Sequence, residues 1–260
     1  MELSLWVGDL SIGQAGLLVL VAVATSALSA VVGMAGGITL LAIMLLYMEP
    51  LVAIPLHAVV QLVSNGSRSL IHRRHIQWRL IWPYFLPLLP LGWWSLSLAE
   101  ALDPAVARSL IGVFVLLATW RPSWLLLGTQ PERAWPRLRF LFLGTIVGIL
   151  NVTFGATGPL IAPFFLNLGL TRFELIGSKA AAQMGGHVAK IVVFGLVGFA
   201  YANWLGLLSS LCLAVVGGTW LGTRVLGRVN EVWFVRIYRF VLTMVALRLA
   251  IPSFPTFGAD

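Results

Sequence analysis

The sequence predicts an all-α polytopic membrane protein, with about eight transmembrane helices, short broken or re-entrant segments and two inverted structural repeats. Three observations support this fold class. Hydrophobic residues make up 59% of the 260 residues and charged residues only 10%, whereas soluble domains carry about 25% charged residues. Apolar runs alternate with short basic loops, a pattern typical of membrane proteins. A glycine-rich interruption followed by a polar helix occurs twice, at Gly33 and at Gly155.

The first half contains five apolar segments. A spanning helix needs about 17–25 residues, and only the second segment is clearly too short. Glycines interrupt the chain just before that short segment. The fourth segment contains three prolines, which are tolerated in membranes when neighbouring helices or waters satisfy the freed carbonyls. The segments are residues 15–32, 38–48, 51–71, 80–98 and 106–120.

The second half repeats this plan of a break, a short run and long segments. A short run is followed by a break at 151–159, a second short run, and then three long segments. The apolar segments are residues 140–150, 160–170, 173–200, 204–223 and 232–250. We therefore divide the chain into a first membrane repeat (1–121), a cytoplasmic linker (122–138) and a second membrane repeat (139–260).

Three basic loops predict the orientation of the chain. They are residues 72–79, 121–139 and 224–228, and basic loops favour the cytoplasmic side. Placing all three there is consistent with five segments in each half. Because five is odd, the second half enters the membrane inverted relative to the first, as in many secondary transporters. Both termini are then predicted to lie outside.

Each half carries a polar stripe on its long helix. The spacing of i, i+4, i+8 and i+11 places each set on one helix face. Such side chains either form hydrogen bonds between helices or line a cavity, and the duplication favours a cavity. The stripes are His57, Gln61, Asn65 and Arg68 in the first half, and Lys179, Gln183, His187 and Lys190 in the second.

Arg68 and Lys190 are predicted to be buried cations. Charge at the centre of a bilayer costs about 2.5–3.5 kcal/mol on insertion scales, so it usually faces a cavity or a partner. All nine Asp and Glu residues fall in predicted loops or at helix ends, which favours an anion from solution as the partner. The alternatives are that either side chain extends to the membrane interface, or that Lys190 pairs with a carboxylate across the bundle.

The two glycine breaks are predicted to offer backbone N–H groups to an anion. A helix that restarts after a break presents free N–H groups and the positive end of its dipole. The alternative is that the glycines only permit close packing or a kink. The candidate residues are Gly33, Gly36 and Gly37 in the first break, and Gly155, Thr157 and Gly158 in the second.

The sequence shows none of the motifs that mark common enzymes or metal sites. It has one cysteine, no H-E-x-x-H, no G-x-S-x-G and no P-loop. We therefore predict a secondary anion transporter that is not an enzyme, with no cofactor, no metal and no nucleic-acid partner. A coupled proton or sodium ion is a further candidate partner of this mechanism. The alternatives are a passive anion channel or, from another class, a membrane-embedded enzyme or assembly factor.

Two blocks of the sequence resemble the TauE/SafE family of sulfite exporter and sulfonate uptake permeases. The first is SAVVGMAGGIT (residues 29–39) with residues 55–69 behind it, and the second is GILNVTFGATGPLIAP (residues 148–163) followed by residues 178–198. The resemblance implies a helical inner-membrane permease for small sulfur-containing or carboxylated anions. Ala35 and Thr157 stand where the family's breaks would have glycine.

Overall fold

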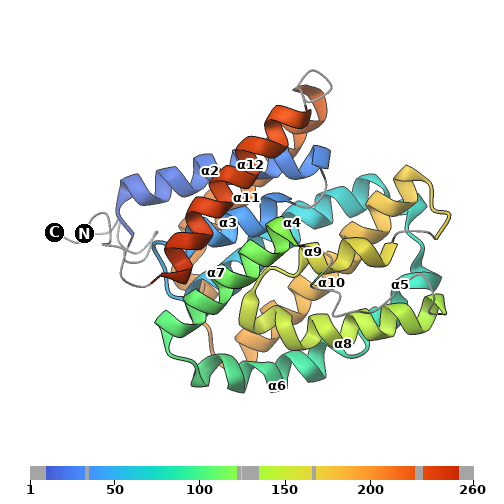
Figure 1. Ribbon diagram of the computed structural model, residues 1–260, viewed down its shortest axis with the longest axis horizontal. Helices are drawn as coiled ribbons and strands as arrows, with labels where there is room; N and C mark the ends of the chain where they lie inside the picture. The colour runs from blue at the N-terminus through green and yellow to red at the C-terminus, as the bar shows by residue number, and fades with distance from the viewer. Residues whose placement is uncertain are drawn as a thin grey trace.

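The computed structural model describes residues 10–32, 35–121, 124, 135–165, 168–225 and 231–251. As predicted, all regular structure in these ranges is helical, and no strand occurs among them. The two longest helices lie in the middle of the bundle and the others surround them (Figure 1). Gly33, most of the predicted linker and both chain ends fall outside the described residues.

The described part of the first half contains six α-helices, where five segments were predicted. The predicted segment at 80–98 is two helices, because Pro87 has no backbone N–H with which to continue the first of them. A 3₁₀ turn at Arg73–His75 joins the third helix to the fourth. The helices are α2 (Ile12–Val32), α3 (Ala35–Met44), α4 (Pro50–Ile71), α5 (Trp78–Phe85), α6 (Leu88–Ala101) and α7 (Pro104–Trp120).

The second half follows the predicted order with a shorter break. The helix before the break continues through Asn151 to Phe154, and the interruption is confined to residues 155–157. This helix is capped at its C-terminal end by Gly155, whose φ of 74° is a left-handed conformation that glycine adopts without strain. The helices are α8 (Pro136–Phe154), α9 (Gly158–Ile161) with a 3₁₀ turn at Ala162–Phe165, α10 (Arg172–Leu196), α11 (Leu205–Val225) after a 3₁₀ turn at Tyr201–Trp204, and α12 (Glu231–Ala250).

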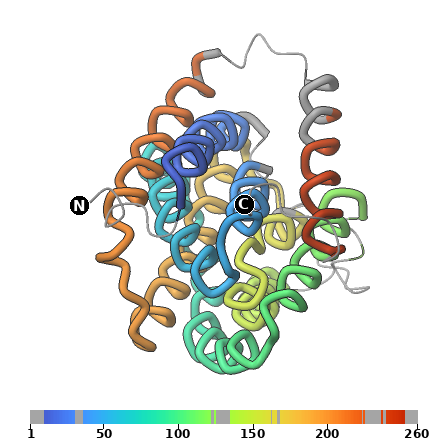
Figure 2. Tube along the Cα trace, turned by 90° about the vertical axis from the view of Figure 1, so that its left-hand side faces the viewer, coloured from blue at the N-terminus to red at the C-terminus, as the bar shows by residue number. Residues whose placement is uncertain are grey.

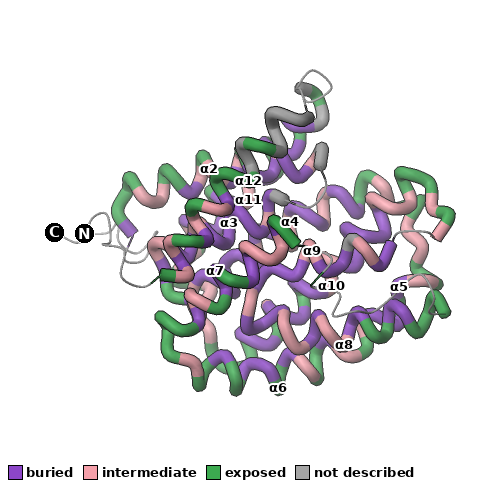
Figure 3. The backbone as a smooth tube through the Cα atoms, in the orientation of Figure 1, coloured by how far each residue is buried: buried purple, intermediate pink, exposed green. Residues whose placement is uncertain are grey.

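The largest helix contacts join one helix from each half of the chain. α2 packs on α11, α6 packs on α8, α4 packs on α10, and α7 packs on α12. Consequently α11 and α12, although consecutive in the sequence, lie on opposite sides of the bundle (Figure 2). Buried residues concentrate along the central helices and exposed residues on the outer turns (Figure 3).

Three described segments are long and apolar enough to cross a membrane by length and composition. They are Ile12–Ala30, Pro136–Phe154 and Tyr201–Gly222. α4 and α10 are also long, at 22 and 25 residues, but they carry the two polar stripes. The structure is thus consistent with a membrane protein whose two polar-stripe helices, α4 and α10, pack on each other.

The contact between α2 and α11 depends on glycines that leave no space for a side chain. A Cβ at Gly222 would collide with the backbone of Ala27, whereas a Cβ at Gly217 on the same helix meets nothing within 4 Å. We predict that Gly222→Ala destabilises the fold by about 1–3 kcal/mol, the usual cost of overpacking. The measurement is thermal unfolding of the purified protein in detergent.

Gly217→Ala is the matched control, because it adds the same methyl group to the same helix where space is open. Its stability should be unchanged or higher, since alanine favours a helix over glycine by about 1 kcal/mol. Equal melting temperatures for the two variants would show that α2 and α11 do not pack as described.

Candidate functional site

The second break is held by Lys190 and by close contacts with the first half. The Lys190 ammonium, on α10, donates a hydrogen bond to the Gly155 carbonyl. A Cβ at Gly155 would lie 2.6 Å from a Leu41 methyl group and 2.9 Å from Ile54 Cγ1. Gly155 therefore serves two needs, a left-handed turn and a close approach to α3 and α4.

The first break is fixed by analogous hydrogen bonds from α2 and α4. The Gly36 N–H donates to the Ser29 hydroxyl at 3.1 Å, and the Gly37 carbonyl accepts from His57 Nε2 at 2.8 Å. Gly36 also lies so close to the Thr25 carbonyl that no side chain would fit. The start of α3 is thus tied to the helix before it and the helix after it.

Arg68 is buried and its guanidinium is held on three sides. It donates to the Ser29 carbonyl at 3.2 Å, to the Asn65 side-chain oxygen at 2.8 Å and to the Ser64 carbonyl at 3.4 Å. Arg68 therefore reaches a carbonyl near the end of α2, as Lys190 reaches the carbonyl that follows α8. Each cation lies at the negative end of a helix dipole, which stabilises positive charge.

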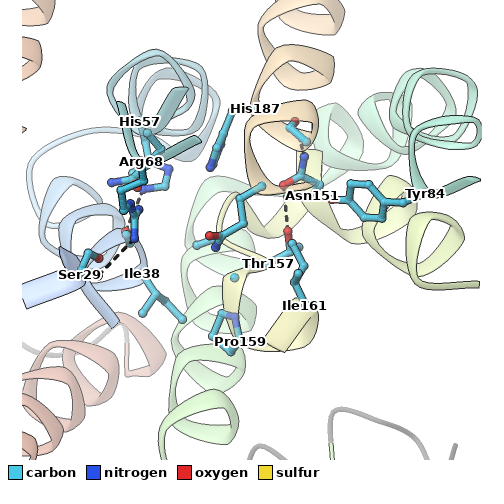
Figure 4. Close-up of a pocket in the computed structure, with 16 residues that line it drawn as sticks. Ser29, Ile38, His57, Arg68, Tyr84, Asn151, Thr157, Pro159, Ile161 and His187 are labelled. Atoms are coloured by element: carbon cyan, nitrogen blue, oxygen red, sulfur yellow. Dashed lines mark hydrogen bonds between the residues drawn. The ribbon is translucent and has the colours of Figure 1, made fainter. Parts of the chain in front are cut away.

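A cavity lies between these two arrangements, where α4 faces α10 (Figure 4). The cavity has a volume of about 30 Å³, which is room for about two or three water molecules. None of its lining residues is an Asp or a Glu. The described carboxylates instead lie at helix ends, as predicted: Glu49, Glu100, Asp103 and Glu174.

Several buried polar atoms on the cavity wall have no hydrogen-bond partner. Buried polar groups are nearly always paired, so each exception needs an explanation. Of the eight unpartnered buried side-chain atoms among the described residues, four belong to residues that line this cavity. They are His57 Nδ1, Tyr84 Oη, Gln183 Oε1 and His187 Nδ1. A polar ligand in the cavity would supply partners for them.

The structure brings most of the predicted site residues to this cavity. Gly37, Gln61, Arg68, Thr157, Gly158, Gln183 and His187 line it. Four others do not line it: Asn65 bonds Arg68 and the Gln61 carbonyl, Gly36 bonds Ser29, and Gly155 and Lys190 bond each other. Gly33 lies outside the described residues.

Three polar lining residues lie outside the two predicted stripes and the candidate break residues, namely Ser29, Tyr84 and Asn151. Asn151 donates to the Gly186 carbonyl at 2.7 Å and accepts from the Thr157 hydroxyl at 3.2 Å, so it links α8, the break and α10. Asn151 could have been selected from the sequence, because it is a lone asparagine in an apolar run. Tyr84 lies in a proline-rich segment where nothing in the spacing indicates the cavity. His57 also lines the cavity, as its place in the predicted polar stripe led us to expect.

Comparison with protein families gives a match. A protein family described as "Sulfite exporter TauE/SafE" matches residues 18–249, which is most of the chain. The match includes both breaks, both polar stripes and every residue that lines the cavity. Neither a search of curated proteins nor one of solved structures gave a match.

Lys190 provides a test of whether its buried charge serves the structure or a ligand. Lys190→Met keeps the length of the side chain and removes the charge. Losing a charged hydrogen bond costs about 1.5–3 kcal/mol, whereas desolvating an ion costs several kcal/mol. We therefore predict that Lys190→Met raises the melting temperature of the ligand-free protein, measured in detergent.

Arg79→Met is the control, because Arg79 is exposed and its charge carries little desolvation cost. It should leave the melting temperature nearly unchanged. A marked fall in the melting temperature of Lys190→Met would instead identify Lys190 as a structural cap of α8.

Proposed function

The chain belongs to the sulfite exporter TauE/SafE family, and on that premise we propose that it is a secondary transporter of a small anion. The substrate is sulfite, an organosulfonate or a related sulfur-containing or carboxylated anion. It crosses the inner membrane through the cavity between α4 and α10, and the protein carries out no chemistry on it.

The observation that carries this proposal is the character of the cavity wall. Arg68 supplies positive charge, no carboxylate among the lining residues offsets it, and the buried Tyr84 hydroxyl is unpartnered and can donate to an anion. Lys190 adds a second buried charge directly behind the wall, at the Gly155 carbonyl. The hydrogen bond to this neutral carbonyl leaves the ammonium charge in place, so an anion in the cavity is attracted from both sides.

The helix pairing supports two inverted repeats around this site. α2, the first described helix of the first half, packs on α11, which follows the polar-stripe helix α10. α8, the first described helix of the second half, packs on α6, which lies after the polar-stripe helix α4 and the short α5. The two stripe helices, α4 and α10, pack on each other. In this proposal a two-fold axis through the contact between α4 and α10 relates these pairs. Sites of inverted-repeat transporters lie on such an axis, at broken helices. Rocking of the paired helices about it would open the cavity to each side in turn.

The size of the cavity favours a substrate with few heavy atoms. Room for about two or three water molecules suits a group such as sulfite or the sulfonate head of a larger molecule. We expect longer organic tails to require an opening of the cavity.

An isosteric substitution on the cavity wall tests the sign of the substrate's charge. Gln183→Glu adds a carboxylate without changing the volume of the side chain. Because it would pair with Arg68 or Lys190 and repel an anion, we predict that it abolishes uptake of labelled sulfite and methanesulfonate by proteoliposomes. Gln14→Glu is the matched control, since Gln14 lies at the start of α2 outside the cavity, and its uptake should equal that of the unmodified protein.

Counterflow separates a transporter from a channel in the same proteoliposomes. A transporter accelerates uptake of labelled anion when unlabelled anion fills the interior, whereas a channel does not. Equal uptake by Gln183→Glu and the unmodified protein would contradict the proposed site. Absence of uptake across sulfite, methanesulfonate and small carboxylates would contradict the proposed substrate class.

A further inference from the structure

Two histidines meet in the cavity, one from each half of the chain. His57 on α4 and His187 on α10 are both buried, with ring centroids 6.0 Å apart and ring planes at 80°. Figure 4 shows both rings at the cavity wall, with Arg68 on the same side as His57. Neither Nδ1 atom has a hydrogen-bond partner.

The hydrogen bond to Gly37 decides where a proton would add on His57. A carbonyl oxygen only accepts, so the Nε2 atom that lies 2.8 Å from the Gly37 oxygen carries the hydrogen. In the neutral ring Nδ1 is then a bare lone pair. It becomes a donor only if the ring takes up a proton.

While its ring is neutral, His57 offers an anion no donor in the cavity. The Nδ1 lone pair of His57 would repel anion oxygens, and the Arg68 guanidinium already donates to Ser29, Ser64 and Asn65. A proton on the histidine pair converts a repelling lone pair into a charged N–H donor, and hydrogen bonds of that kind are about twice as strong as neutral ones.

The neighbouring charges make this protonation conditional on a bound anion. Lys190 and Arg68 face the pair, Lys179 lies near Arg68, and Tyr84 faces the cavity from α5. The other described elements add no charge to the cavity wall. There is no ionisable side chain on α2, α3 or α9. No described ionisable residue lines the cavity from α6, α7, α8, α11 or the Arg73–His75 turn. Burial and then the nearby cations disfavour an added proton in the cavity, and a bound anion offsets the repulsion by the cations. The same cations oppose a metal ion at the two nitrogens.

We propose that His57 and His187 form a shared proton site that takes up one proton together with the anion, which makes the protein an anion–proton symporter. This inference rests on the proposed function and adds the coupled ion to it. Two positive charges 6.0 Å apart disfavour each other, so the pair holds a single proton. Because linkage is reciprocal, the proton strengthens anion binding as much as the anion strengthens protonation.

The test is the pH dependence of anion binding to the purified protein, measured by titration calorimetry with methanesulfonate and with sulfite. Methanesulfonate gains no proton near neutral pH, so any proton taken up with it enters the protein. Uptake of one proton requires that affinity strengthen as pH falls, by up to about tenfold per pH unit. Calorimetry in two buffers of different ionisation enthalpy gives the number of protons directly.

We expect about one proton per methanesulfonate bound at the steepest part of the profile between about pH 6 and about pH 8. The double variant His57→Gln/His187→Gln should lose the pH dependence and the proton uptake, and each single variant should weaken both. His75→Gln is the control, because this exposed histidine of the basic loop lies outside the cavity and should leave both unchanged.

The outcomes separate this inference from the function on which it rests. Binding by the unmodified protein without proton uptake would overturn the proton site alone. Full proton uptake by the double variant would do the same and would assign the proton to a lysine. Absence of binding by both anions would overturn the proposed function, and the proton site with it.

Discussion

Arg68 and Lys190 are buried cations that donate to carbonyl oxygens near the ends of α2 and α8, and much of the central bundle is arranged around these contacts. A cation in a membrane needs a cavity or a partner. The carbonyls near the helix ends provide partial compensation, because they lack some of the hydrogen bonds of a continuing helix. The breaks therefore have a role before any substrate is considered, since they create the polar ends that the cations contact.

The same contacts explain why the cavity remains polar and small. Arg68 fixes Asn65 and the end of α2, while His57 fixes the start of α3 through Gly37. On the other side, Asn151 holds Thr157 and the Gly186 carbonyl. These bonds satisfy the structural groups and leave a few atoms, chiefly on the histidines, Tyr84 and Gln183, without partners. Those atoms are the ones available to a ligand.

Much of this arrangement was predictable from the sequence, since apolar runs and glycine breaks are local signals. Helices α2, α4, α7 and α12 lie within a few residues of the predicted segments, and the stripes on α4 and α10 face each other. The split at Pro87 and the continuation of α8 past Asn151 were not predicted. The carbonyl partner of Lys190 was not predictable either, because every residue has a carbonyl and only the fold selects one. Tyr84 was not predicted either, because its position at the cavity depends on how the two halves pack together.

The most direct test of the central claim is to locate a bound anion by diffraction. Selenite has the shape and charge of sulfite, and its selenium atom gives an anomalous signal. We predict one strong anomalous peak between α4 and α10, within hydrogen-bond distance of His187 or Tyr84, that disappears when excess sulfite is added. A sulfite-displaceable peak elsewhere, with this cavity empty, would contradict the account.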